Sequence, residues 1–184
     1  MPLSFAFFLH CPVPAFVFSF LGFAKHVSFG MGYYGEISKG YDALHFEEQA
    51  EKAALIMGNC PLKGLLLDIG AGTGKITRLF QDKAKCIALD PSKEMLSHFS
   101  GLKVAARAEQ LPFKNACFDS VVSITALHHA DLAMAKKEIL RVSKPNACIA
   151  ISFFKRAKNF MAAKKAFQKF RQFDSEKDLI FIKQ

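Results

Sequence analysis

The sequence predicts a single α/β domain with a doubly wound, mostly parallel sheet and helices on both of its faces. Short apolar runs alternate with segments of helical periodicity from residue 42 to residue 182, a pattern typical of parallel strands joined by crossover helices. The apolar runs lack polar alternation, as expected of strands that are buried on both sides. With 184 residues, the chain is long enough for one such domain and too short for two comfortable ones.

Each expected strand is a short apolar or β-branched run, and each expected helix has one apolar face. We expect strands at residues 65–69, 86–89, 102–106, 118–124, 148–154 and 179–182. We expect helices at residues 42–57, 75–84, 92–99, 132–142 and 157–173. Ser92 and Asp131 are expected to cap the helices at whose start they stand, and a turn at residues 144–146 precedes the fifth strand. On the first helix, Glu48 and Lys52 are assigned to the outward, polar face.

Residues 1–30 form an apolar extension that differs in composition from the domain at residues 31–184. The extension has one formal charge, Lys25, and its uninterrupted apolar stretch, residues 15–24, is shorter than the roughly 20 residues of a spanning helix. Three interpretations stay open: a membrane-surface anchor, a poor targeting segment, or translation begun upstream of the natural start, which we favour. Contact with a membrane surface is therefore expected only through residues 1–30.

The net charge of +9 is concentrated near the C-terminus, where residues 155–184 carry nine Lys or Arg against three Asp or Glu. We interpret this segment as an amphipathic helix with a solvated basic face. An RNA-facing surface or contact with anionic lipid are the alternatives, and the sequence leaves nucleic-acid binding uncertain.

The five cysteines are far apart in the sequence, without a C-x-x-C pair or a cluster with histidine. We therefore expect reduced thiols, a cytoplasmic protein and no metal site.

A glycine-rich loop, Gly70-Ala71-Gly72-Thr73-Gly74, joins the first expected strand to the following helix. In parallel sheets ligands bind at such loops, where glycine permits positive φ and the start of the helix offers N–H groups. The spacing is G-x-G-x-G, unlike the G-x-G-x-x-G of dinucleotide sites, and Asp68 precedes it. A carboxylate at this place would repel a phosphate but suits an ammonium group. A P-loop is excluded because Ile76, which has no hydroxyl for magnesium, follows Gly74-Lys75.

Asp90 ends the second expected strand, 22 positions after Asp68. An acidic side chain at this distance beyond the loop is placed to accept both hydroxyls of a ribose. Taken alone, the loop could be a tight turn and Asp90 a turn or cap residue. Together they predict a site for an adenosine that carries an amino acid and no phosphate.

Four segments resemble the class I S-adenosylmethionine-dependent methyltransferases, and especially the branch of ubiquinone/menaquinone-biosynthesis methyltransferases. LLLDIGAGTGKIT resembles motif I of this family, and CIALDPSKEML resembles its second motif. AEQLPFKNACFDSVVSITALHH and AKKEILRVSKPNACIAIS resemble the segments that lead through the fourth and fifth strands. The resemblance covers about residues 33–154 and implies a Rossmann-like fold with S-adenosyl-L-methionine as cofactor.

The resemblance also implies roles for single residues. Asp68, Gly70, Ala71, Gly72 and Gly74 would surround the methionine end of the cofactor. Asp90 would hold the ribose, Pro91 and Ser92 would flank the adenine, and Ala108 and Glu109 would lie beside its amino group. Thr125 and Leu127 would lie near the sulfonium, while Tyr33, Tyr34 and Tyr41 belong to a region that often closes over the cofactor.

Two positions depart from the family pattern. Arg107 stands where an aspartate commonly binds the adenine amino group, and a guanidinium accepts no hydrogen bond; Glu109 or a backbone carbonyl could replace it. Asn146-Ala147 replaces the usual Gly-Gly of the turn before the fifth strand, and asparagine tolerates such turns.

The sequence thus predicts an S-adenosyl-L-methionine-dependent methyltransferase with an unidentified acceptor, a small molecule being favoured over RNA or protein. His128 is the candidate base, although both His128 and His129 could simply contact solvent. The acceptor could be held by residues 31–45, by a second copy of the chain or by a partner subunit. The alternatives are a non-catalytic cofactor-binding subunit that supports a partner enzyme and, against the loop spacing, a nicotinamide-dependent oxidoreductase.

Overall fold

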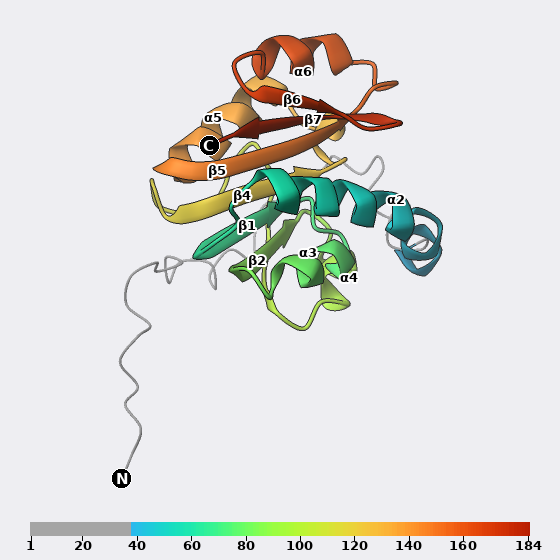
Figure 1. Ribbon diagram of the computed structural model, residues 1–184. Coiled ribbons are helices and arrows are strands. Elements are labelled where there is room, and N and C mark those ends of the chain that lie inside the picture. The colour runs from blue at the N-terminus through green and yellow to red at the C-terminus, as the bar shows by residue number, and fades with distance from the viewer. Residues whose placement is uncertain (1–37) are drawn as a thin grey trace, which may run out of the picture.

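A computed structural model describes residues 38–184, with side chains from residue 46 onward (Figure 1). Its seven strands form one sheet in the order β3-β2-β1-β4-β5-β7-β6. The strands are β1 Leu65–Ile69, β2 Lys85–Asp90, β3 Leu102–Ala105, β4 Phe118–Ile124, β5 Ser143–Phe154, β6 Arg171–Asp174 and β7 Asp178–Lys183. The first five strands pair in parallel, while β7 pairs antiparallel with both β5 and β6. The doubly wound, mostly parallel fold predicted from the sequence is confirmed.

Helices cover both faces of the sheet. They are α2 Ser38–Asn59, α3 Lys75–Phe80, α4 Lys93–Ser97, α5 Leu132–Val142 and α6 Phe160–Ala166, with a short 3₁₀ turn, η2, at Leu127–His129. One apolar core joins the sheet to α5 and α6 through residues such as Ile139 and Phe167, and another joins it to α2 and α3 through Ile56 and Phe80. The apolar faces seen in the sequence therefore point inward on opposite sides.

Local sequence signals give the correct bounds for β1, β4 and α5. Ser92 caps α4, its Oγ accepting from the Met95 N–H at 3.1 Å, and Asp131 caps α5 through the N–H groups of Ala133 and Met134. The turn expected at residues 144–146 lies inside β5 as a bulge, because the register with β4 jumps from Phe118–Ser143 to Ser120–Cys148.

The helix expected at residues 157–173 is wrong in its second half. The helix α6 ends at Ala166, and Arg171–Asp174 form the edge strand β6. Phe173 lies opposite Ile180 of β7, so that pairing with a neighbouring strand overrides the amphipathic helix expected there. Phe160 and Phe167 pack against the core.

The prediction of reduced cysteines is wrong for one pair. Cys60 and Cys148 form a disulfide, with Cα atoms 6.0 Å apart, since the end of α2 lies over β5. Cys86 and Cys117 take no part in a disulfide.

The predictions for the extension at residues 1–30 and for Tyr33 and Tyr34 lie outside the described residues. Within residues 38–184, no helix has the length and apolar character needed to cross a membrane.

Candidate functional site

The glycine loop lies at the carboxyl end of β1 and is shaped by close contacts within the protein. Gly70 and Gly74 have φ values of 76° and 73°, in the left-handed region that favours glycine. A Cβ on Gly70 would lie 2.1 Å from the Cβ of Ala126, and one on Gly74 would lie 2.4 Å from Cδ2 of Phe99. These glycines therefore let the glycine loop approach the loop that follows β4 (the β4 loop) and the segment just after α4.

The N–H groups of the loop are already bonded. Those of Gly70 and Ala71 both donate to the carbonyl of Leu89, at 2.7 and 3.0 Å, and that of Gly74 donates to the carbonyl of Ala71. The N–H of Gly72 donates to Oδ2 of Asp90 at 2.9 Å. A ligand phosphate would find none of these four donors free, which agrees with the phosphate-free ligand that the sequence predicts.

Asp90 joins the loop to the end of β2. Its Oδ2 is held by Gly72, and its Oδ1 accepts from the N–H of Ser92 at 2.8 Å. Burial raises the pKa of Asp90, while the two backbone bonds partly oppose that change. Each oxygen of a carboxylate accepts more than one hydrogen bond, so Asp90 retains the capacity to accept from two ribose hydroxyls.

Asp68 lies beneath the loop, fully buried, and its Oδ2 accepts from Oγ1 of Thr77 at 2.6 Å. Burial raises the pKa of Asp68 to about 7; the Thr77 bond opposes this rise and the nearby Asp90 adds to it. An ammonium group beside Asp68 would bind the charged form and restore its ordinary acidity.

On the predicted adenine side, Ala108 is buried in the core and Pro91 is exposed at the start of α4. The Oε1 of Glu109 accepts from Nη2 of Arg107 and from the N–H of Asp131, both at 3.2 Å. Burial raises the pKa of Glu109, but these bonds outweigh it and the pKa is lowered. Arg107 remains mostly exposed, so its substitution for the family's aspartate places no cation in the interior.

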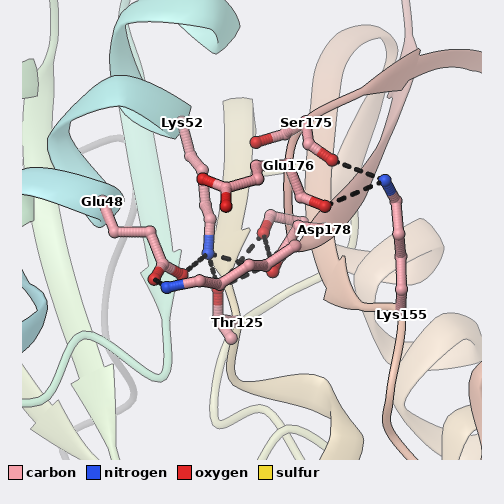
Figure 2. A network of polar contacts seen from close by, with 9 residues as sticks. Glu48, Lys52, Thr125, Lys155, Ser175, Glu176 and Asp178 are labelled. Atoms are coloured by element: carbon pink, nitrogen blue, oxygen red, sulfur yellow. Dashed lines mark hydrogen bonds and ion pairs between the residues drawn. The ribbon is translucent and has the colours of Figure 1, made fainter.

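Thr125 lies at the centre of a polar network that the sequence did not predict. We call this network the ionic centre and define it as Glu48, Lys52, Thr125, Ser152, Lys177 and Asp178; Figure 2 shows most of it. The Nζ of Lys52 lies 2.7 Å from Oε1 of Glu48, 3.0 Å from Oδ1 of Asp178 and 3.1 Å from Oγ1 of Thr125.

Lys52 is therefore not on the outward face of α2, as the sequence suggested, because its side chain is only 1% exposed. The assignment rested on a helical face that placed Ala54 inward, whereas Ala54 is exposed. The signal that could have revealed its burial is its place beside Ala53 and one turn before Ile56, both of which are in the core.

His128 follows the same loop, in η2. Its Nδ1 is buried and has no hydrogen-bond partner among the described residues. Burial and the neighbouring His129 lower the pKa of His128, and Asp178 opposes this change. The ring is therefore neutral near pH 7 and able to accept a proton. Leu127, expected near the sulfonium, is buried in the core.

The structure thus brings the loop, Asp68 and Asp90 together at the ends of β1 and β2, with Thr125 and His128 at the end of neighbouring β4. Among residues 38–184, no three His, Cys, Asp or Glu side chains are grouped as metal ligands.

Comparison with known proteins finds similar sequences and structures. A family profile described as a methyltransferase domain matches residues 67–151. The uncharacterized protein MJ1252 of Methanocaldococcus jannaschii is 33% identical over 116 residues, which are 61% of this chain and 46% of that protein. The uncharacterized methyltransferase YcgJ of Bacillus subtilis is 35% identical over 97 residues, 46% of this chain and 38% of that protein.

Solved structures of other proteins are also similar to this chain. The crystal structure of YcgJ is 28% identical, with a TM-score of 0.54 over 57% of this chain and 51% of its own. The PH0226 protein of Pyrococcus horikoshii, at 16% identity, has a TM-score of 0.70 over 84% of this chain and 98% of its own; at that identity the likeness shows the fold alone.

The sheet order and the acid-glycine loop define a Rossmann-like fold, in which ligands bind beside β1 and β4. The matched profile and the relatives named methyltransferases make residues 67–151 similar to the class I S-adenosylmethionine-dependent methyltransferases. The chain spans less than half the length of the curated relatives it matches.

Proposed function

We propose that this protein transfers a methyl group from S-adenosyl-L-methionine to an acceptor that is still to be identified. The observation that carries the proposal is the bond between Gly72 N–H and Asp90, which joins the glycine loop and the ribose-binding acid into one unit. The relatives that are named methyltransferases support the same activity.

The protein's part in the reaction is mainly to position the reactants. The cofactor supplies the sulfonium-bound methyl group. Asp90 would hold the ribose and Asp68 the amino group, while Ala108 and Glu109 would lie beside the adenine. Fixing both reactants in line can supply about 7–11 kcal/mol in favourable intramolecular cases.

His128 is the group we assign to proton removal. Its pKa is lowered by burial, and its Nδ1 has no partner among the described residues. A neutral imidazole accepts a proton from an O–H or N–H acceptor as it attacks the methyl group. A small molecule is the favoured acceptor.

A partner subunit or a second copy of the chain would complete the acceptor site. A Haloferax volcanii protein solved in complex with the Trm112 methyltransferase activator has a TM-score of 0.66 over 81% of this chain, at 18% identity. The comparison supports a partner as a possible arrangement for this fold.

Calorimetry with S-adenosylhomocysteine tests the cofactor site. Asp90→Ala should weaken binding about 100-fold or more, because hydrogen bonds to a charged group contribute about 1.5–3 kcal/mol each. Asp82→Ala is the matched control, since Asp82 is exposed in the turn after α3. Unchanged binding in Asp90→Ala, or no binding by the wild type, would refute the proposal.

Transfer itself is tested by incubating the protein with cell extract and cofactor that carries a deuterated methyl group. The expected result is a labelled product, detected by mass spectrometry, which disappears with Asp90→Ala. A competition with NAD, expected to have no effect, separates this function from that of an oxidoreductase.

A further inference from the structure

We propose that Lys52 and Asp178 are positioning residues for methyl transfer: they hold Thr125 in a left-handed conformation that fixes the β4 loop against the glycine loop. This inference rests on the proposed function. It concerns the geometry of the site where donor and acceptor meet, and it assigns the buried ion pair a role outside cofactor binding.

The first step is the backbone of Thr125. Its φ is 52°, a value that is a genuine outlier for a β-branched residue. Such residues keep a sparsely populated conformation only where their surroundings hold them, and they cluster at functional sites. Here, the outlier follows directly after β4, at the carboxyl edge of the sheet.

The second step is what holds Thr125. Its hydroxyl lies 3.1 Å from Nζ of Lys52, 2.8 Å from Oδ2 of Asp178 and 3.2 Å from Oγ of Ser152. Its N–H donates to the carbonyl of Ser152 at 3.2 Å. Ser152 also donates to Oδ2 of Asp178. Three elements, α2, β5 and β7, therefore converge on one side chain.

The third step is the free-energy cost of burying the charges of Lys52 and Asp178 beside Thr125. The side chains of Lys52 and Asp178 are 1% and 0% exposed. A buried ion pair is weak grounds for a purely stabilising role, since apolar residues of the same volume often serve as well. Its convergence on a strained residue at the carboxyl edge of the sheet favours a positioning role.

The fourth step connects Thr125 to the cofactor loop. β1 and β4 are neighbours in the sheet, and the chain reverses its direction of winding between them, which is where ligands bind in such folds. Ala126, directly after Thr125, occupies the space that a Cβ on Gly70 would need, 2.1 Å away. The turn at Thr125 therefore sets the spacing between the two loops, and it also sets where η2 and His128 begin.

The ionic centre supplies geometry and no net charge. Glu48 pairs with both Lys52 and Lys177, at 2.7 and 2.6 Å, and Asp178 pairs with Lys52. Two carboxylates thus balance two ammonium groups, so that the centre has no excess charge with which to select an acceptor.

The test uses the double variant Lys52→Met/Asp178→Leu, which removes both charges and leaves neither unpaired. We expect it to bind S-adenosylhomocysteine within about threefold of the wild type. We expect its transfer rate to extract acceptors, at saturating deuterated cofactor, to fall by about tenfold or more. Adding Thr125→Gly should recover at least part of the loss, because glycine adopts the left-handed conformation without support.

Thr125→Val keeps the ion pair and the side-chain shape but removes the hydroxyl, so it tests the inference even if the double variant does not fold. It should lower the transfer rate by more than it weakens cofactor binding, as in the double variant. Wild-type transfer by Thr125→Val, or by a folded double variant, would overturn the inference. So would equal losses of binding and transfer, or a triple variant no faster than the double. Failure of the wild type to bind cofactor would instead refute the proposed function.

Discussion

The two sides of the site are held together in different ways. On the cofactor side, side chains bind nearby backbone or close neighbours: Asp90 and Ser92 are two residues apart, Thr77 and Asp68 nine, and Gly72 and Asp90 18. Across β4, in contrast, the bonds join distant segments. Lys52 and Thr125 are 73 residues apart, and Lys177 and Glu48 are 129 apart.

The two sides therefore differ in how much of the chain must fold before each of them can form. The cofactor side is a local unit that one strand, loop and strand can form. The ionic centre forms only when α2, β4, β5 and β7 have all packed, because each of them contributes to it or leads into it. The two sides meet where Gly70 contacts Ala126.

The largest effect is expected at that meeting point. Gly70→Ala should lower the free energy of unfolding by about 2–5 kcal/mol, from the left-handed φ and from crowding against Ala126. Gly70→Ala combined with Ala126→Gly should recover part of the loss, as measured by urea unfolding.

Gly58→Ala is the control for Gly70→Ala, because Gly58 is in α2 and no atom lies within 4 Å of its missing Cβ. It should gain about 0.5–1 kcal/mol from helix propensity. Equal stability changes in the two alanine variants would show that the loops are not in tight contact.

Reducing the Cys60–Cys148 disulfide should have the next largest effect. The bond closes a loop with a sequence separation of 88 and joins β5 to the residue that follows α2. Its loss should lower the free energy of unfolding by about 2–4 kcal/mol, measured by urea unfolding with and without dithiothreitol. The Cys60→Ser/Cys148→Ser variant should not respond to the reductant. An equal response of both proteins would contradict the bond.

The smallest effect is a pH dependence on the cofactor side. The pKa of Asp68 is raised by burial to about 7, so its charged form grows as the pH rises from 6 to 8. Binding of S-adenosylhomocysteine should strengthen about three- to tenfold over this range, because the ligand's ammonium group favours the carboxylate. Calorimetry should show a flatter profile and weaker binding at pH 8 for Asp68→Asn.

The same pKa has the opposite effect on stability. Because the folded-state pKa lies above the unfolded value of 3.8, the folded protein binds more protons between these values. Asp68 therefore lowers the free energy of unfolding as the pH rises from about 4 to about 7. Asp68→Asn should lack this decline, and an identical decline in both proteins would assign the titration to another group.

The elements that could be predicted from the sequence are those set by local patterns. The strand β1 is an apolar run closed by glycine, and α5 has its Asp131 cap and apolar face. The proximity of the glycine loop and Asp90 could also be predicted, because a fixed spacing along one βαβ unit brings them together. The cofactor roles of these residues stay predictions.

The remaining features depend on contacts between distant segments. The strand β6 forms within the segment that the sequence predicts to be helical, because its backbone pairs with the edge of β7. Cys60 and Cys148 show no local motif, and they bond because α2 ends over β5. The sequence near Lys52 is typical of a surface lysine, and its burial depends on the charge of Asp178, which lies in β7.

That last contact has a consequence for the order of folding. Until β7 docks, the ammonium of Lys52 lacks its fully buried counterion, Asp178. Packing α2 fully against the sheet before then would bury a charge that only the half-buried Glu48 balances. Docking of the first described helix is thereby coupled to docking of the last strand. An intermediate without that strand would keep water between the helix and the sheet, and the carboxyl edge of the sheet would take its final shape in the last step of folding.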